Sequence, residues 1–351
     1  MPTIDADAHV IESNLTWDFM PKGAGAFRPV EVSTLDGDEV EGRPNRQTEY
    51  WAIDNKLVPR ERNIGHDTAR DAREMRDIER RLEHMNELQI DVQVLYPSLF
   101  LRPLTRKVAA EDAMIAAYND WLAEIWRKGQ GRLRWVALAP LLSLSDPGKV
   151  RAVLAKAKEN GACGVFMCGF ACDREAWDPY FYPLYSIAQE LDLPICFHAG
   201  VDCYPVHDFF ENGDGLAKFK FPVISALHSL LLRGVPERFP GLRWGFVEAG
   251  SAWLPYVLGE LQRRFRRRGK RMSEDMLKTN NMWVACQVTE DLEYIIRWVG
   301  EDQLVVGTDY GHHDTSTEIE AMRLMRDQKR INTGAIDKIL GSNAAALYGF
   351  A

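Results

Sequence analysis

The sequence predicts an α/β fold, specifically a distorted (β/α)8 (TIM) barrel with an insertion after its first strand. Short apolar runs alternate with amphipathic helical stretches along the 351 residues. This alternation is typical of parallel strands joined by crossover helices. In most runs the apolar residues are continuous, as expected for strands that are buried on both faces. A doubly wound open sheet is the structural alternative that this pattern leaves open.

Eight runs mark the predicted strands, and they cover residues 3–10, 91–98, 133–141, 163–170, 194–200, 242–250, 282–288 and 304–311. The clearest helical stretches between them cover residues 67–88, 108–128, 145–159, 180–191, 222–232 and 251–267. In the first of these, Ile78, Leu82 and Met85 recur at helical spacing with charged residues between them. We therefore predict one barrel domain that spans residues 1–351.

A long segment interrupts this rhythm after the first strand. About 55 residues precede the helix near Asp67, more than a plain connection needs. Within them, residues 49–61 contain two short apolar stretches around Asp54 and Asn55, a pair that favours a hairpin turn. We expect residues 11–66 to lie at the carboxyl ends of the strands, either as a lid over the site or as a surface elaboration.

Composition and charge exclude several classes of function. The chain has 43 Lys and Arg against 51 Asp and Glu, and its net charge of −8 argues against nucleic acid or an anionic membrane as partner. No apolar stretch approaches the roughly 18 residues of a membrane span, and the acidic N-terminus lacks the basic segment of a secretory signal. The six cysteines form no CxxC pair, which favours free thiols in a protein of the reducing cytoplasm.

Polar side chains that can bind a metal or move a proton lie at the ends of four predicted strands. The first strand carries Asp7 and His9, the fifth ends at His198, the sixth at Glu248 and the eighth at Asp309. The carboxyl ends of barrel strands meet at one face, so these side chains should converge despite their separation in sequence. Asp7 and His9 are two residues apart and therefore point to the same face of their strand.

Two carboxylates and two imidazoles suit a single divalent ion such as Zn²⁺, Mn²⁺ or Fe²⁺. Taken singly, each residue also has a structural interpretation. A histidine after a buried strand is often a core residue, and an aspartate at a strand end is often a helix cap. We favour the metal site because Asp7, His9, His198 and Asp309 all occupy positions where barrel strands end.

Six segments carry a resemblance to a known family: IDADAHVIE (4–12), MNELQIDVQVLYPS (85–98), ICFHAG (195–200), GVPERFPGLRWGFVEAGSAWLPY (234–256), VVGTDYGHHD (305–314) and KILGSNAAALYGF (338–350). The chain resembles the metal-dependent amidohydrolase superfamily. It is most similar to the amidohydrolase-related branch, which includes aminocarboxymuconate-semialdehyde decarboxylase and benzoate-type decarboxylases. The resemblance implies a homodimer and a distorted barrel with one divalent ion, held here by Asp7, His9, His198 and Asp309.

Three positions depart from patterns found in the superfamily. Asp7-Ala8-His9 stands where many members have His-x-His, although some decarboxylases of the branch have Glu at the first position. The added negative charge should raise the pKa of bound water, which favours decarboxylation over hydrolysis.

Glu248 stands where family decarboxylases often have an acid/base His. It could be an acid/base group, a further ligand or a structural residue, and we prefer the first. Residues 163–170 lack the bridging Lys of binuclear members, which favours one ion.

The sequence thus predicts a metal-dependent decarboxylase of a small aromatic or unsaturated organic acid, with Glu248 and Asp309 as catalytic residues. The alternative is a metal-dependent hydrolase of an ester, lactone, amide or thioester in which Glu248 acts as base. A third interpretation is a binding protein with a degenerate site. Loops after barrel strands gather substrate contacts, and the candidates in them are Arg102, His207, His312 and His313.

Overall fold

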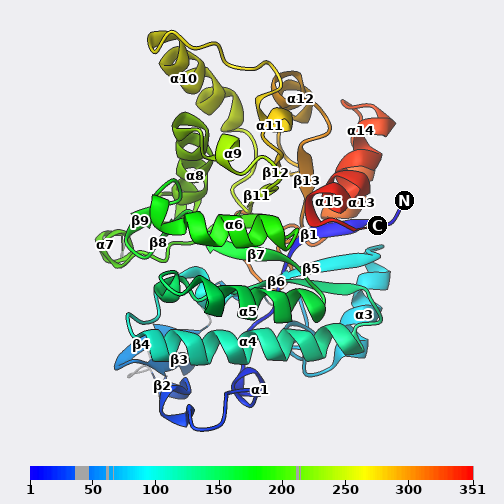
Figure 1. Cartoon of the computed structure of the whole chain (residues 1–351). Helices are drawn as coiled ribbons and strands as arrows, with labels where there is room; N and C mark the ends of the chain where they lie inside the picture. The colour runs from blue at the N-terminus through cyan, green and yellow to red at the C-terminus, as the bar shows by residue number, and fades with distance from the viewer. Residues whose placement is uncertain (36–46, 61–62, 66, 211–212, 214, 351) are drawn as a thin grey trace, which may run out of the picture.

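Eight parallel strands form a nearly closed barrel with helices between them, which confirms the predicted fold (Figure 1). The computed structural model describes residues 1–35, 47–60, 63–65, 67–210, 213 and 215–350. The strands follow one another around the barrel in chain order, without the reversal that a doubly wound sheet requires. They are β1 (Ile4–His9), β5 (Val92–Tyr96), β6 (Leu133–Ala137), β7 (Ala162–Cys168), β10 (Ile195–His198), β11 (Trp244–Val247), β12 (Met282–Cys286) and β13 (Leu304–Val306).

The barrel closes where the first strand meets the last. The backbone N–H of His9 donates to the Tyr310 carbonyl at 2.8 Å, and that of Asp309 donates to the Asp7 carbonyl at 2.9 Å. Gly307 permits this approach, because a Cβ there would lie 2.4 Å from the Cβ of Asp7. The seam therefore places the first-strand pair beside the end of the eighth strand.

A buried polar network crosses the same seam below the strand ends. The Asp5 carboxylate accepts from Thr308 N at 2.9 Å and from Thr308 Oγ1 at 2.6 Å. It also accepts from Gln93 Nε2 at 2.9 Å. Arg81, which is fully buried, donates to Gln93 Oε1 at 2.7 Å and to the His9 carbonyl at 3.3 Å. These bonds fix the backbone on both sides of the barrel closure.

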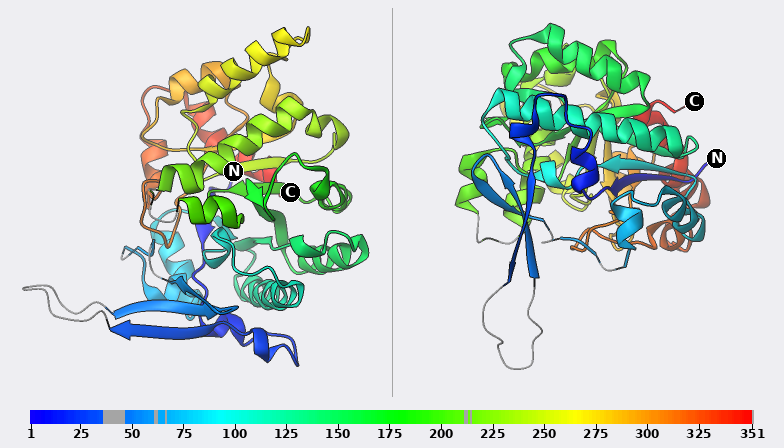
Figure 2. Two further views of the ribbon diagram at one scale, coloured as in Figure 1. Left: turned by 90° about the vertical axis from the view of Figure 1, so that its left-hand side faces the viewer. Right: turned by 90° about the horizontal axis from the view of Figure 1, so that it is seen from below.

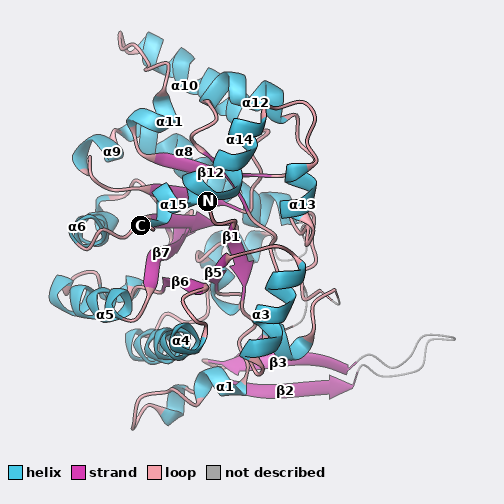
Figure 3. Ribbon diagram, turned by 90° about the vertical axis from the view of Figure 1, so that its right-hand side faces the viewer, coloured by secondary structure: helices cyan, strands magenta, loops and turns pink. Residues whose placement is uncertain are grey.

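Helices surround the strands in the predicted order, as Figure 3 shows. The predicted stretch at 67–88 is interrupted, because Met75 has a left-handed backbone with φ of 53° and the Asp77 side chain caps a new helix. The longer helices are α3 (Ile78–Glu87), α4 (Val108–Lys128), α5 (Pro147–Glu159), α6 (Tyr182–Glu190), α8 (Phe221–Arg233), α10 (Leu254–Arg267) and α12 (Leu292–Val299).

Short elements complete the connections between strands. The short α-helices are α1 (Asn14–Trp17), α2 (Arg70–Arg73), α7 (Tyr204–Phe209), α9 (Val235–Arg238), α11 (Met276–Thr279), α13 (Ala321–Arg326), α14 (Thr333–Asp337) and α15 (Asn343–Tyr348). A small hairpin consists of β8 (Phe170–Ala171) and β9 (Arg174–Glu175). Single turns of 3-10 or π helix are η1 (Gly25–Phe27), η2 (Leu99–Leu101), η3 (Leu141–Ser143), η4 (Pro179–Phe181), η5 (Leu216–Lys220) and η6 (Lys338–Ser342).

The insertion after β1 contains a three-stranded antiparallel sheet of β2 (Val30–Leu35), β3 (Gln47–Ile53) and β4 (Lys56–Pro59). The structure contains the expected β3–β4 hairpin, in which Asp54 and Asn55 have φ of 47° and 63°, as a tight hairpin turn requires. Strand β2 was missing from the prediction. Figure 2 shows β2 and β3 projecting from the barrel. Parts of the predicted 11–66 segment, at 36–46, 61–62 and 66, lie outside the described residues.

Candidate metal centre and active site

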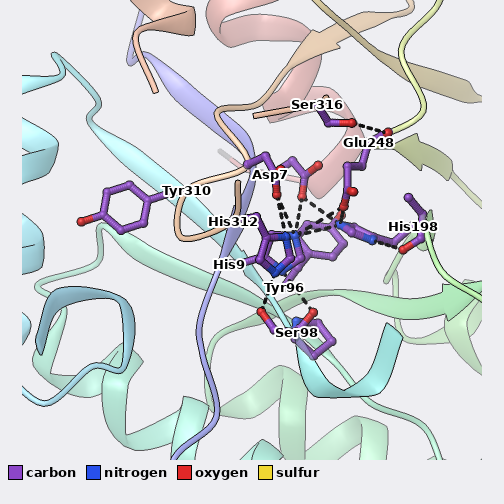
Figure 4. Close-up of polar contacts among 12 residues, drawn as sticks. Asp7, His9, Tyr96, Ser98, His198, Glu248, Tyr310, His312 and Ser316 are labelled. Carbon is purple, nitrogen blue, oxygen red and sulfur yellow. Dashed lines mark hydrogen bonds and ion pairs between the residues drawn. The ribbon is translucent and has the colours of Figure 1, made fainter. Parts of the chain in front are cut away.

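Six buried side chains converge at the carboxyl end of the barrel (Figure 4). Each is at most 8% exposed. They form two groups that share His9, and within each group the ligand atoms all lie within 4.8 Å of one another. The six residues are Asp7, His9, His198, Glu248, Asp309 and His312. The structure thus brings together all four residues that the sequence predicts as metal ligands.

The distances within the cluster suit a single ion. Nε2 of His9 lies 3.0 Å from Nε2 of His198 and 3.4 Å from Oδ1 of Asp309. Oδ1 of Asp7 lies 3.3 Å from Nε2 of His198 and 3.7 Å from Nε2 of His9. Ligands that lie roughly 2.0–2.2 Å from an ion are separated from one another by about 3–3.6 Å. Asp7, His9 and His198 therefore surround a space of the right size, and Asp309 adjoins it beside His9.

Hydrogen bonds set the tautomers of the two imidazoles that face the cluster. Nδ1 of His9 lies 3.1 Å from the Pro97 carbonyl, and Nδ1 of His198 lies 2.8 Å from the Ala199 carbonyl. Because a carbonyl only accepts, each neutral ring carries its proton on Nδ1 and presents an unprotonated Nε2. In the neutral rings, both Nε2 atoms are thus able to bind a metal.

The oxygens that point into the cluster are a second observation that favours a bound cation. In the part of the chain that the structure describes, Oδ1 of Asp7, Oε2 of Glu248 and Oδ1 of Asp309 are buried and make no hydrogen bond of regular geometry, although imidazole nitrogens lie close to them. Oε2 of Glu248 lies only 2.9 Å from Nε2 of His198. Although burial lowers it, the pKa of His198 is raised well above its usual range by the charges of Glu248 and Asp7. Buried acceptors that face one another are unfavourable unless a cation or a proton satisfies them. A divalent ion is the group that this arrangement fits.

Burial changes the acidity of the cluster. It raises the pKa of Glu248 to about 8, against the opposing effect of His198. It also raises the pKa of Asp309 and lowers that of His9 well below its usual range. Without an ion, the raised pKa values of Glu248 and His198 favour protons on these two groups, and an incoming cation competes with those protons. Metal affinity should increase with pH for this reason.

Backbone strain aims two of the carboxylates inward. Glu248 and Asp309 have φ of 62° and 55°, the left-handed region that side chains other than glycine rarely adopt. The loop after β13 holds both residues. Ser316 Oγ donates to the Glu248 carbonyl at 3.0 Å, and Thr317 Oγ1 donates to Oδ2 of Asp309 at 2.7 Å. Glu248 and Asp309 thus combine an uncommon backbone conformation with buried carboxyl groups at the cluster.

His312 lies inside the cluster, whereas we expected it in a substrate-contacting loop. Its ring stacks on that of His9 with a centroid distance of 3.7 Å, and its Nδ1 lies 2.9 Å from Oδ1 of Asp309. Its Nε2 lies 2.8 Å from Ser98 Oγ. His312 is therefore placed to orient Asp309 or to act as a further ligand. His313, the next residue, has a side chain that is 73% exposed.

A cavity of about 1140 Å³ opens beside the cluster. Arg102, His207 and His313, three of the predicted substrate-contact residues, line it, as do Tyr50 and residues 56–59 of the insertion. Figure 1 shows β4 and α7 on the same side of the barrel, where both contribute to this cavity. The insertion thus forms one wall of the space into which a substrate would bind.

A (β/α)8 barrel whose strand ends gather buried carboxylates and imidazoles has the architecture of the metal-dependent barrel enzymes. The chain belongs to the amidohydrolase family, whose model matches residues 4–350. This membership confirms the resemblance found in the sequence motifs. No helix among the described residues has both the length and the apolar character needed to cross a bilayer.

Solved structures with the same fold include enzymes of different reactions. An amidohydrolase of Mycobacterium avium subsp. paratuberculosis is 19% identical over 99% of both chains, with a TM-score of 0.76. The 5-carboxyvanillate decarboxylase of Novosphingobium aromaticivorans, solved with manganese, is 21% identical over 78% of this chain and 81% of that chain, with a TM-score of 0.64. The 4-oxalomesaconate hydratase of Rhodopseudomonas palustris is 16% identical over 99% of this chain and 95% of that chain, also with a TM-score of 0.64. At these identities the likeness shows the fold alone.

Metal removal should destabilise the protein, because the buried carboxylates lose their counter-charge. An ion at 100 times its dissociation constant stabilises the folded state by about 2.7 kcal/mol, which corresponds to roughly 5 °C in a protein of this size. Thermal unfolding of EDTA-treated protein with and without added Mn²⁺ measures this shift. The Asp7→Asn/Asp309→Asn double variant is the control and should not respond. Equal shifts in both proteins would contradict the site.

Proposed function

We propose that the protein is a metal-dependent decarboxylase of an organic acid. One observation carries the proposal. Among the residues that the structure describes, Glu248 is the one member of the six-residue cluster that also lines the cavity. A side chain in that position would contact both an ion at the cluster and a substrate in the cavity. It is therefore placed to transfer a proton at the reacting atom.

The residues of the cluster divide the work between them. Asp7, His9, His198 and Asp309 would hold the ion. A bound divalent ion supplies positive charge that attracts the substrate carboxylate and stabilises negative charge as CO₂ departs. When the carbon–carbon bond breaks, its electron pair stays on the substrate carbon, and Glu248 gives its proton to that carbon. Glu248 then regains a proton from solvent. Its protonated form also avoids repulsion of the incoming carboxylate.

The second candidate is a reaction that consumes water, either hydrolysis of an ester, lactone, amide or thioester or the hydration of a double bond. One observation supports it: a hydratase is among the structures that share this fold over 99% of the chain. In this reaction Glu248 starts unprotonated and takes a proton from water. The two candidates thus need opposite protonation states of the same residue.

A paired assay on the Mn²⁺-loaded protein tests the proposal. A panel of aromatic and unsaturated carboxylic acids is incubated in D₂O, and CO₂ release is measured together with deuterium at the carbon that lost it. A parallel panel of esters, lactones and unsaturated acids is incubated in H₂¹⁸O. CO₂ release with one deuterium per product supports the decarboxylase. Incorporation of ¹⁸O into the product without release of CO₂ would contradict the decarboxylase and support the water-consuming reaction.

A further inference from the structure

The fold fixes the direction of the His312 ring. His312 is 5% exposed, and its ring stacks on that of His9 with an angle of 27° between the two planes. Its backbone N–H donates to the Asp309 carbonyl at 3.1 Å, and it forms an antiparallel bridge with Ile64. Gly65 permits this bridge, because a Cβ there would lie 2.6 Å from the His312 carbonyl oxygen. The two nitrogens of the ring therefore have defined surroundings.

Ser98 determines which nitrogen of His312 carries a hydrogen. Ser98 Oγ donates its one hydrogen to the Val10 carbonyl at 2.8 Å, because a carbonyl only accepts. The same oxygen lies 2.8 Å from Nε2 of His312, below the stacked rings in Figure 4, so it accepts from an Nε2–H group. A neutral His312 ring therefore has an unprotonated Nδ1. This tautomer is the opposite of the one found for His9 and His198.

Nδ1 of His312 faces the cluster without a regular hydrogen bond. It lies 2.9 Å from Oδ1 of Asp309, yet among the described residues neither atom has a hydrogen-bond partner. Nδ1 of His207 and Oδ1 of Asp208 do form such a bond, at a longer distance of 3.2 Å. Nδ1 of His312 and Oδ1 of Asp309 thus lie close together without pointing at one another. Atoms that bind a common ion have this arrangement, with a separation of about 3 Å.

The ligand atoms around His312 reach the space beside His9. Nδ1 of His312 belongs to the group in which the ligand atoms of His9, Glu248 and Asp309 all lie within 4.8 Å of one another. Nε2 of His9 lies 3.4 Å from Oδ1 of Asp309 and is shared with the group that contains His198. An ion bound to Nε2 of His9 would therefore be adjacent to Nδ1 of His312 as well.

We propose that His312 is a further ligand of the divalent ion, bound through Nδ1, and that Ser98 holds its ring in the tautomer that allows this. The proposal shares with the proposed function the ion at the cluster, but it does not depend on the reaction. With His312 the donor set contains three imidazoles, which favours Zn²⁺ or Fe²⁺ over Mg²⁺ or Ca²⁺. Glu248, which lines the cavity, then remains available for proton transfer.

The rival arrangement is an imidazolium at His312 that only pairs with Asp309. Burial lowers the pKa of His312, but the charge of Asp309 acts in the opposite direction and the pKa is raised. In the protein without an ion, a proton on Nδ1 would thus occupy the side of the ring that faces the cluster. The two arrangements differ in one observable property, since Nδ1 of the metal-loaded protein is bonded either to the ion or to a hydrogen.

Nuclear magnetic resonance of the full chain, labelled with ¹⁵N-histidine and loaded with ¹¹³Cd²⁺, tests the proposal without turnover. The ¹¹³Cd nucleus couples to the nitrogens that are bonded to it, and correlations with the ring hydrogens show which nitrogen each one is. We expect three coupled histidines, with Nε2 bonded in His9 and His198 and Nδ1 bonded in His312. The His312→Gln variant should lose only the Nδ1 signal. His313→Gln is the matched control, because the His313 side chain is 73% exposed, and it should keep all three.

Metal affinity provides a second measurement on the same residues. In a competition titration with a chelating dye, His312→Gln should weaken Mn²⁺ binding more than about 100-fold, beyond the range of a residue that only supports a ligand. Ser98→Ala should weaken it about 10-fold to 100-fold, whereas Ser98→Thr keeps the hydroxyl and should retain most of the affinity. His313→Gln should not change it. Unchanged circular dichroism establishes that the variants fold.

Two coupled histidines in the unsubstituted protein, with hydrogens on both nitrogens of His312, overturn the proposal. Coupling to Nε2 of His312, or to no histidine at all, also overturns it. Unchanged affinity in Ser98→Ala overturns the part assigned to Ser98. Failure of the proposed function is a separate result. If three histidines bind the ion but no acid releases CO₂, the ligand stands and the decarboxylase proposal fails. If CO₂ is released and only two histidines are coupled, the reverse holds.

Discussion

Asp309→Asn should abolish turnover and remove the metal, although the substitution barely changes the shape of the side chain. Oδ1 of Asp309 lies 3.4 Å from Nε2 of His9 and 2.9 Å from Nδ1 of His312, so it faces the centre of the cluster. Asparagine there loses the negative charge that attracts a divalent ion. Because residues that only support metal ligands are worth about 10–100-fold in affinity, loss of a ligand should exceed that range. We expect turnover to fall at least about 1,000-fold.

Asp192→Asn is a matched control for this substitution. Asp192 also has a left-handed backbone, with φ of 52°, but it lies before β10, at the opposite end of the barrel from the cluster. The metal content and kcat of the Asp192→Asn variant should equal those of the unsubstituted protein. Metal content after dialysis and kcat on the best substrate are the two measurements. If Asp309→Asn retains one ion per chain, Asp309 is not a ligand.

The fold and the convergence of the four candidate ligands could be predicted because both follow from local patterns combined with one rule of architecture. Continuous apolar runs identify buried parallel strands, and barrel strands present their carboxyl ends at a common face. Asp7, His9, His198 and Asp309 each lie at the end of such a run. Their convergence therefore needs no knowledge of the connecting helices.

The position of His312 could not be predicted in this way. It lies in a loop, and its inward direction depends on the left-handed backbone of Asp309 and on the turn in which His312 N donates to the Asp309 carbonyl at 3.1 Å. The repeated histidines at 312 and 313 gave no indication of which one turns inward. Strand β2 was missed because residues 36–46 separate it in sequence from its partner β3, so no two-residue turn signal links the two strands.

Glu248→Gln should reduce kcat by about 100-fold to 10,000-fold, the usual contribution of an acid/base group, while one ion per chain is retained. The amide keeps the size of the side chain but cannot give a proton to carbon. Glu12→Gln is the matched control, because Glu12 is also buried but only accepts from the backbone N–H groups of Ser98 and Leu99. The Glu12→Gln variant should change kcat less than about tenfold. Loss of the ion from the Glu248→Gln variant would instead identify Glu248 as a ligand.

The pH profile decides in which direction Glu248 moves its proton. Burial raises the pKa of Glu248 to about 8, and a nearby cation lowers it from there by favouring the carboxylate. Decarboxylation needs protonated Glu248, which predominates below the pKa of Glu248 in the metal-loaded protein. The kcat of a decarboxylase should therefore fall as pH rises through this pKa. A water-consuming reaction needs the carboxylate, so its kcat should rise over the same range. In each case Glu248→Gln should remove this limb, and a limb that persists in the variant would assign the titration to another group.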